Sequence, residues 1–352
     1  MRKSFQIAGA YIGLIVGAGF ASGQEVLQFF TSFGWYSILG TIVAMFLFAF
    51  LGMQVMQIGS KLQTTSHKEV VYKICGKYLG AGVDILVTFF LFGVAVVMIA
   101  GSGAIFEQQF GISPLIGNIL LTLLVIITLC FNVKNVISII SMITPFLLIL
   151  IFIIVGYSIV TSNSSLEELN AIASDQPSAA PNWLVGGILY VSYNIAAGIS
   201  MLTVIGGTVK DRKVASRGGI IGGIGLGLLL LLINLALLMN ADHILGADMP
   251  MLMLATEISP IVGILMAIAL LGMVFNTTVG MLYAFTARLV EPETRKFKWS
   301  VIVIGFLAFG ASFVGFMTLV GTVYPITGYL GLALIIAIFV SWITMRKEQR
   351  AK

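Results

Sequence analysis

The chain consists mostly of long apolar runs separated by short polar stretches. These runs are about as long as, or longer than, the roughly 20 residues with which an α-helix crosses the hydrocarbon core of a bilayer. The pattern therefore predicts an all-α integral membrane protein with ten transmembrane helices. The expected spans are residues 6–30, 34–60, 81–109, 113–131, 135–161, 183–208, 217–240, 259–289, 299–316 and 319–345.

Basic residues lie on only one side of this arrangement. If the N-terminus is cytoplasmic, all 19 Lys and Arg residues fall in cytoplasmic loops or termini, where inserted membrane proteins retain positive charge. These residues are Arg2, Lys3, Lys61, Lys68, Lys73, Lys77, Lys134, Lys210, Arg212, Lys213, Arg217, Arg288, Arg295, Lys296, Lys298, Arg346, Lys347, Arg350 and Lys352. The opposite loops carry acidic residues such as Glu167 and Asp242. Both termini are therefore expected in the cytoplasm.

Composition agrees with a membrane protein, because 59% of the 352 residues are hydrophobic and only 9% are charged, far from the averages of soluble domains. The net charge of +5 comes from the cytoplasmic loops, so we expect no nucleic-acid partner. Cys75 and Cys130 both fall on or near the cytoplasmic side. A disulfide is not expected there, and two thiols alone make no metal site.

Five predicted helices precede the longest loop and five follow it, so the second set enters the bilayer from the opposite side. This is the condition for an inverted repeat, a common plan of secondary transporters. Recurring landmarks support it, because Gly198 follows Gly19 by 179 residues and Pro325 follows Pro145 by 180. The predicted units are a first repeat at residues 1–165, an extracellular linker at 166–182 and a second repeat at 183–352.

Two spans contain residues that disfavour a continuous helix. The first has glycine at positions 13, 17, 19 and 23, and each glycine lowers helix stability by about 1 kcal/mol. The sixth contains the small and polar stretch Ser192–Ser200. We expect helices one and six to be broken, so that freed backbone groups hold a ligand or an ion. The alternative is that these small residues only allow close packing, which is the interpretation we favour for Gly218–Gly223 in the seventh helix.

The tetrapeptide Gly17-Ala18-Gly19-Phe20 resembles the helix-one signature of the amino acid–polyamine–cation superfamily, which has the LeuT-type fold of two inverted five-helix repeats. The longer segment Gly17–Glu25 resembles YkvI-like bacterial membrane proteins, a resemblance that covers the whole chain. It implies a multi-pass transporter of the bacterial inner (cytoplasmic) membrane, with substrate between the breaks in helices one and six. The implied substrate-binding residues are Gly17, Ala18, Gly19, Phe20, Ser102, Tyr193, Asn194, Ala197 and Gly198.

The resemblance also implies a sodium site between helices one and eight. With the two signature glycines aligned, the expected ligands are the backbone carbonyls of Gly13, Val16 and Val274 and the hydroxyls of Thr277 and Thr278. Such a set offers about five oxygens to a hard cation without buried net charge. The alternative is that the two threonines bond back to carbonyls of their own helix.

Glu25, with Gln24 beside it, is the only acidic residue placed well inside a predicted span. A carboxylate in lipid is costly and is a functional group by default. We expect Glu25 to bind a substrate amine, to carry a coupling proton or to act in an extracellular gate. The alternative is that it faces water near the outer interface. Asp84 and Glu107 lie near the ends of the third span and are expected to be solvated.

The expected function is secondary active transport of a small amino acid or related zwitterion or amine by alternating access, with sodium symport first and proton coupling through Glu25 second. A ligand-sensing receptor subunit with the same fold and a channel are the alternatives. No organic cofactor is expected. No enzyme is expected either, because the spans lack a nucleophile with a nearby base. Pro250 is expected to begin a short extracellular helix.

Overall fold

The computed structural model describes residues 2–63, 67–130, 143–161, 166–292 and 294–350, and their regular secondary structure is entirely helical. In these residues six helices are long and apolar enough to cross a membrane, and two further apolar helices are shorter. The predicted count of ten stays a prediction, because the first span is interrupted and the fifth lies partly outside the described residues. Lys134 and Lys352, which belong to the predicted charge pattern, also lie outside them.

Glycine and proline set several boundaries in the first half. Gly111 takes a left-handed φ of 64° just after α5, and Pro114 begins α6, where its missing N–H is no loss. A left-handed Gly76 also interrupts the first turns of α5. The elements of this half are α1 (Arg2–Ile15), α2 (Ala18–Ser22), α3 (Gln24–Phe29), η1 (Thr31–Phe33), α4 (Tyr36–Leu62), α5 (His67–Phe110), α6 (Pro114–Cys130), α8 (Ile143–Thr161) and α9 (Leu166–Ser174).

Polar side chains cap helices of the second half. The side chains of Asn182, Asp211, Ser259 and Thr294 each accept a hydrogen bond from a backbone N–H of the first turn that follows, which satisfies a donor that the helix itself cannot pair. The predicted short helix beginning at Pro250 is confirmed. The elements are α10 (Trp183–Gly207), α11 (Arg212–Leu238), α12 (Pro250–Ile258), α13 (Pro260–Leu289), α14 (Arg295–Ser312) and α15 (Phe316–Arg350).

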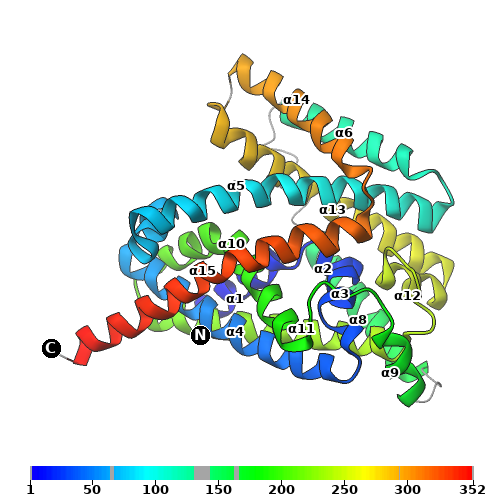
Figure 1. The fold of residues 1–352 in the computed structure, drawn as a ribbon, viewed down its shortest axis with the longest axis horizontal. Coiled ribbons are helices and arrows are strands. Elements are labelled where there is room, and N and C mark those ends of the chain that lie inside the picture. Colours follow the sequence, from blue (N-terminus) through cyan, green and yellow to red (C-terminus); the bar gives the residue numbers. More distant parts are fainter. Residues whose placement is uncertain (1, 64–66, 131–142, 162–165, 293, 351–352) are drawn as a thin grey trace.

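The long helices pack in two groups (Figure 1). One contains α1, α4, α10 and α11, and the other contains α5, α6, α13 and α14, which lie together in the upper part of the view. Glycines join α11 to α4. A Cβ on Gly223 would lie 2.3 Å from the backbone nitrogen of Ala49, and one on Gly219 would lie 2.6 Å from that of Met53. The predicted close packing of this glycine-rich stretch is therefore confirmed.

The segment predicted to be a linker contains a helix. In α9, Leu169 and Ala173 lie one turn apart and bury against Leu238 and Ala241, which explains why this polar stretch folds. The side-chain oxygen of Asn170 also accepts a hydrogen bond of 2.8 Å from the backbone N–H of Trp35. The two chain ends lie towards one end of the molecule, and α9 and α12 lie towards the other (Figure 1).

Candidate functional site

The first helix is interrupted at the predicted place. Helix α1 ends at Ile15, Gly17 has an extended backbone, and α2 begins at Ala18. A second turn follows at Gly23, whose left-handed φ of 84° separates α2 from α3. Because α1 ends inside the bundle, its last carbonyl groups lack the partners that a continuous helix would provide. Such groups are tolerated at membrane depth only beside protein, water or a ligand.

A cavity of about 380 Å³ lies at this break, and we call it the central cavity. It has the size of a pocket for a small molecule. Its walls come from the interrupted first helix, α5, α10, α13 and α15. The lining residues are Gly13, Leu14, Ile15, Val16, Gly17, Ala18, Gly19, Glu25, Phe90, Val94, Met98, Tyr193, Asn194, Ala197, Gly198, Met201, Met273, Asn276, Thr277, Gly280, Met281 and Tyr324.

Glu25 is the charged residue of the central cavity. Its side chain is only 6% exposed, so the alternative of a water-facing position at the interface is wrong. The hydroxyl of Tyr193 donates a hydrogen bond of 2.6 Å to Oε2 of Glu25, and Tyr324 places a second hydroxyl near the carboxylate. None of the residues lining the cavity is Lys or Arg. The carboxylate is thus held by hydrogen bonds without a basic partner from the cavity walls.

Glycine and aromatic residues position Glu25. A Cβ on Gly19 would lie only 1.8 Å from Oε1 of Glu25, so a larger residue there would displace the carboxylate. The rings of Tyr193 and Tyr324 stack with centroids 4.8 Å apart and an angle of 14°. Phe90 lies against both rings. The packing therefore orients the two hydroxyl groups as well as the carboxylate.

Seven of the nine substrate-binding residues expected from the sequence line this cavity. Ser102 does not, which corrects that expectation. Its hydroxyl donates to the carbonyl of Ile99 at 2.7 Å, and the neighbouring Gly103 packs on Asn118 of α6. Steps of four residues drift by about 40° around a helix, so the α5 face that presents Val94 to the cavity has turned away by Ser102.

Two other expected residues lie beside the cavity without lining it. Phe20 is 1% exposed and packs in the core. Gln24 is fully buried, and neither its amide nitrogen nor its amide oxygen has a hydrogen-bond partner in the described part of the chain. Both residues follow the break, and neither is among the residues that line the cavity.

The sixth predicted helix is continuous, so the expectation of a second break is wrong. Helix α10 runs without interruption from Trp183 to Gly207. Its polar side chains find partners without unwinding, because the amide of Asn194 donates to the carbonyl of Tyr190 at 2.9 Å and the hydroxyl of Ser192 donates to that of Gly328 at 2.7 Å. No residue of α10 has a positive φ.

The residues expected to bind sodium are only partly brought together. Gly13, Val16 and Thr277 line the central cavity. Thr278 and Val274 are buried in α13, where the hydroxyl of Thr278 donates to the carbonyl of Val274 at 2.7 Å. For Thr278 the structure therefore has the back-bonded arrangement that is common for threonine in helices.

Sequence reasoning missed several lining residues. Tyr324 immediately precedes Pro325, and Asn276 immediately precedes Thr277, so each lay next to a residue already singled out. A polar residue within an apolar span was the available signal. Phe90 and Met273 carried no such signal, because apolar residues in a membrane helix are equally suited to contact lipid.

No family model matches the chain. Its fold is similar to those of known transporters. It aligns with MhsT in complex with L-phenylalanine at a TM-score of 0.65 and 17% identity, covering 96% of this chain and 88% of MhsT. It aligns with the inward-facing conformation of Mhp1 at a TM-score of 0.60 and 14% identity, covering 93% and 73%. A mutant of the manganese transporter from Eremococcus coleocola gives a TM-score of 0.60 and 15% identity, covering 94% and 78%. The chain thus has the LeuT-type fold.

Two proteins of Bacillus subtilis (strain 168) are similar in sequence over almost their full lengths. The protein YyaD is 28% identical over 332 residues, which cover 93% of each chain. The membrane protein YkvI is 31% identical over 330 residues, which cover 94% of this chain and 93% of YkvI. The chain belongs to the family of the bacterial membrane protein YkvI.

Proposed function

We propose that the protein is a secondary active transporter that moves a small amino acid, or a related zwitterion or amine, by alternating access. The substrate would bind in the central cavity with its amine on Glu25. The substrate would lie beside Asn194, where the small residues Gly17, Ala197 and Gly198 would leave room for a compact molecule. Tyr193 and Tyr324 would orient the carboxylate and close one side of the bound substrate.

The observation that carries the proposal is a buried carboxylate without a basic partner in its cavity. Removing a charge from water is expensive unless an opposite charge or hydrogen bonds compensate it. Tyr193 supplies one hydrogen bond, and the cavity walls supply no cation. A substrate ammonium would complete the compensation. The charge of Glu25 would then be fully compensated only when substrate is bound, so the cavity would distinguish its loaded state from its empty state, as alternating access requires.

Sodium is the proposed coupling ion. Gly13, Val16 and Thr277 line the cavity, and their carbonyl and hydroxyl oxygens are ligands that suit a hard cation. Val274 and Thr278 would complete the set if the Thr278 hydroxyl oxygen turned a lone pair to the ion. Proton coupling is the second candidate, because protonation of Glu25 would remove its buried charge while Tyr193 could still hydrogen-bond to the carboxyl group.

The test is uptake of a labelled amino-acid and amine mixture into proteoliposomes, with an inward sodium gradient and a matched potassium control at fixed pH. We expect sodium-dependent accumulation that falls to background in Glu25→Gln. Glu291→Gln, which changes an exposed residue outside the cavity, is the control and should transport normally. Thr277→Ala should weaken the dependence on sodium.

Each alternative has its own outcome. Equal uptake in both salts that responds to a proton gradient would contradict sodium coupling and favour Glu25 as the proton carrier. Binding of a ligand without flux, detected by thermal stabilisation of the purified protein, would contradict transport and favour a ligand-sensing subunit. Full activity of Glu25→Gln would contradict the proposed binding group.

A further inference from the structure

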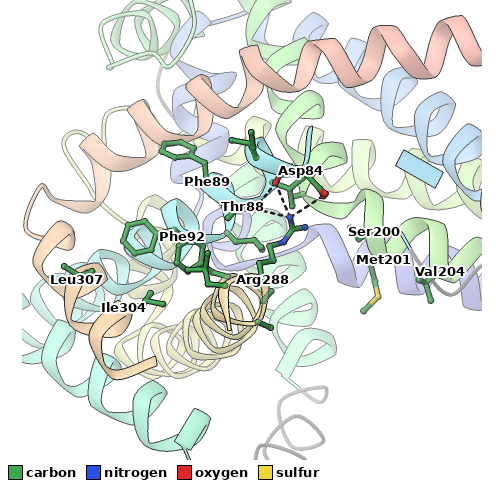
Figure 2. Close-up of a pocket in the computed structure, with 18 residues that line it drawn as sticks. Asp84, Thr88, Phe89, Phe92, Ser200, Met201, Val204, Arg288, Ile304 and Leu307 are labelled. Carbon is green, nitrogen blue, oxygen red and sulfur yellow. Dashed lines mark hydrogen bonds and ion pairs between the residues drawn. The ribbon is translucent and has the colours of Figure 1, made fainter. Parts of the chain in front are cut away.

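A second and larger opening lies between α5, α10, α13 and α14, and we call it the lateral groove (Figure 2). Its volume is about 1290 Å³. This exceeds the roughly 300–1,000 Å³ typical of pockets for compact small molecules. Only four of its lining residues are polar or charged, namely Asp84, Thr88, Ser200 and Arg288. The groove therefore combines a small polar site with long apolar walls.

Arg288 is held in place in the groove, between the lining residues of α14 and those of α10 (Figure 2). Its Nη1 contacts the backbone oxygen of Asp84 at 3.1 Å, Oδ1 of Asp84 at 3.4 Å and the hydroxyl of Thr88 at 3.0 Å. The Thr88 hydroxyl itself donates to the Asp84 carbonyl at 2.8 Å. The described residues provide partners for Nη1 alone. The N–H groups on Nε and Nη2 remain available, and a guanidinium presents them as a fork that suits a phosphate or carboxylate.

The ion pair lies at the depth in the membrane where lipid headgroups, rather than acyl chains, are expected. Asp84 is near the beginning of the apolar span Gly80–Phe110, and Arg288 is next to the last residue of the span Pro260–Leu289. Residues at the ends of spans lie near the boundary between hydrocarbon and headgroups. The expectation that Asp84 is simply solvated is thus incorrect, because Arg288 covers it and only 25% of its side chain is exposed.

The walls of the groove are apolar and open to the surroundings. Ile85 is 72% exposed and Leu307 is 61% exposed. On one side of the ion pair, Phe92 of α5 lies near Ile304 and Leu307 of α14 (Figure 2). Ser200, Met201 and Val204 of α10 lie on the other side. In a membrane protein such a surface faces lipid, and acyl chains would cover it without a desolvation cost.

We propose that the lateral groove is a binding site for a phospholipid whose headgroup carries both a phosphate and an amine. The phosphate would accept hydrogen bonds from Nε and Nη2 of Arg288, the amine would lie against Asp84, and an acyl chain would follow Phe89 and Leu307. The two opposite charges of the Arg288–Asp84 pair match a headgroup that is itself zwitterionic better than one with net charge.

This lipid would adjoin the proposed transport site. Ala197 and Met201 of α10 line both the central cavity and the lateral groove. An acyl chain beside Met201 would therefore limit how far this side chain can move out of the central cavity. The inference itself does not rest on transport, because lipid binding is measured on the purified protein.

The experiment is native mass spectrometry of the full chain in detergent, titrated separately with phosphatidylethanolamine and phosphatidylglycerol. We expect one phosphatidylethanolamine to bind preferentially. Arg288→Ala should weaken it about tenfold, the loss expected for a charge-assisted hydrogen-bonded group. Arg295→Ala, at an exposed position outside the groove, should bind like the wild type. Ala287→Phe should also weaken binding, because it fills the groove and leaves the ion pair in place.

A third titration uses glycerophosphoethanolamine, which has the headgroup without acyl chains. Weak binding of this compound supports a lipid site, whereas binding as tight as that of the lipid would overturn the proposal in favour of a soluble ligand. Unchanged lipid affinity in both Arg288→Ala and Ala287→Phe would also overturn it, and so would a preference for phosphatidylglycerol. Loss of transport in Glu25→Gln with intact lipid binding would separate this site from the central cavity.

Discussion

The first helical segment and α10 occupy corresponding places in the two predicted repeats, and both are rich in small and polar residues. Only the first is interrupted, at Gly17 and again at Gly23. The glycines of α10 have a different role. A Cβ on Gly186 would lie 2.4 Å from the carbonyl oxygen of Phe29, and one on Gly206 would lie 2.3 Å from that of Met56. These glycines let helices approach each other while α10 stays helical.

The difference shows that glycine content alone does not predict a break. In α10 the polar side chains bond to carbonyls within reach of a regular helix, as Asn194 does with Tyr190. In the first segment Gly23 adopts a left-handed conformation that other residues avoid. Gly19 then leaves space for the carboxylate of Glu25. The first segment is therefore broken where Gly23 turns the backbone and where the Glu25 carboxylate occupies the space beside Gly19.

The largest expected difference between the two segments is in the effect of an alanine substitution at Gly19 and at Gly198. Gly19→Ala would place a methyl group 1.8 Å from Oε1 of Glu25, which we expect to abolish uptake and to cost roughly 1–3 kcal/mol of stability, as overpacking does. The nearest atom to a Cβ on Gly198 is 3.4 Å away, so Gly198→Ala should fold normally and gain up to about 1 kcal/mol from helix propensity. Thermal unfolding in detergent measures the stability of both variants, and proteoliposome uptake measures their activity. Equal effects of the two substitutions would contradict the different roles assigned to Gly19 and Gly198.

The left-handed turn is the next point of difference. Gly23→Ala combines the left-handed φ with a contact of 2.8 Å to Cγ of Met251, and we expect a loss of about 1–2 kcal/mol. Gly9→Ala is the matched control, since a Cβ there has no neighbour within 4 Å. The measurement is the free energy of unfolding of both variants. An unchanged value for Gly23→Ala would mean that the turn can straighten into a continuous helix.

The hydrogen bond between the two segments has a smaller expected effect. Tyr193→Phe removes the donor to Glu25 but keeps the ring stacked on Tyr324. A net hydrogen bond is worth about 1 kcal/mol, so we expect the KM for uptake to rise roughly fivefold. Tyr283→Phe removes a hydroxyl from an exposed tyrosine and should leave KM unchanged. A KM that stays constant in Tyr193→Phe would remove Tyr193 from the site.

The smallest expected effect concerns the short helix that packs on the first segment. Helix α12 packs on α2 and α3, and Asp248 lies just before it. Burial and the nearby Glu107 raise the pKa of the Asp248 carboxyl above its ordinary value of 3.8. Folding therefore favours the protonated form of Asp248. The resulting contribution to the stability of the folded protein is present at low pH and is lost as pH rises through the raised pKa. Asp248→Asn should stabilise the protein slightly at neutral pH and not near pH 4, as thermal unfolding at both pH values would show.

Several features were predictable because they depend on neighbours in sequence. Apolar length marked the long helices, and Pro250 marked the start of α12. The dense glycines of the first segment marked its break. The continuity of α10 and the position of Ser102 were not predictable in this way. They depend on which helix lies opposite, such as α15 beside Ser192 or α6 beside Gly103.

Apolar length and local backbone preference act over a few residues, so they were enough to predict a helical membrane protein whose first span is interrupted. The residues that form the central cavity could be identified only once the packing of the helices was known. Tyr193 and Glu25 are 168 residues apart in the chain, and Tyr324 joins them from the last long helix. No local pattern specifies such a meeting, since it results from how separate helices pack together.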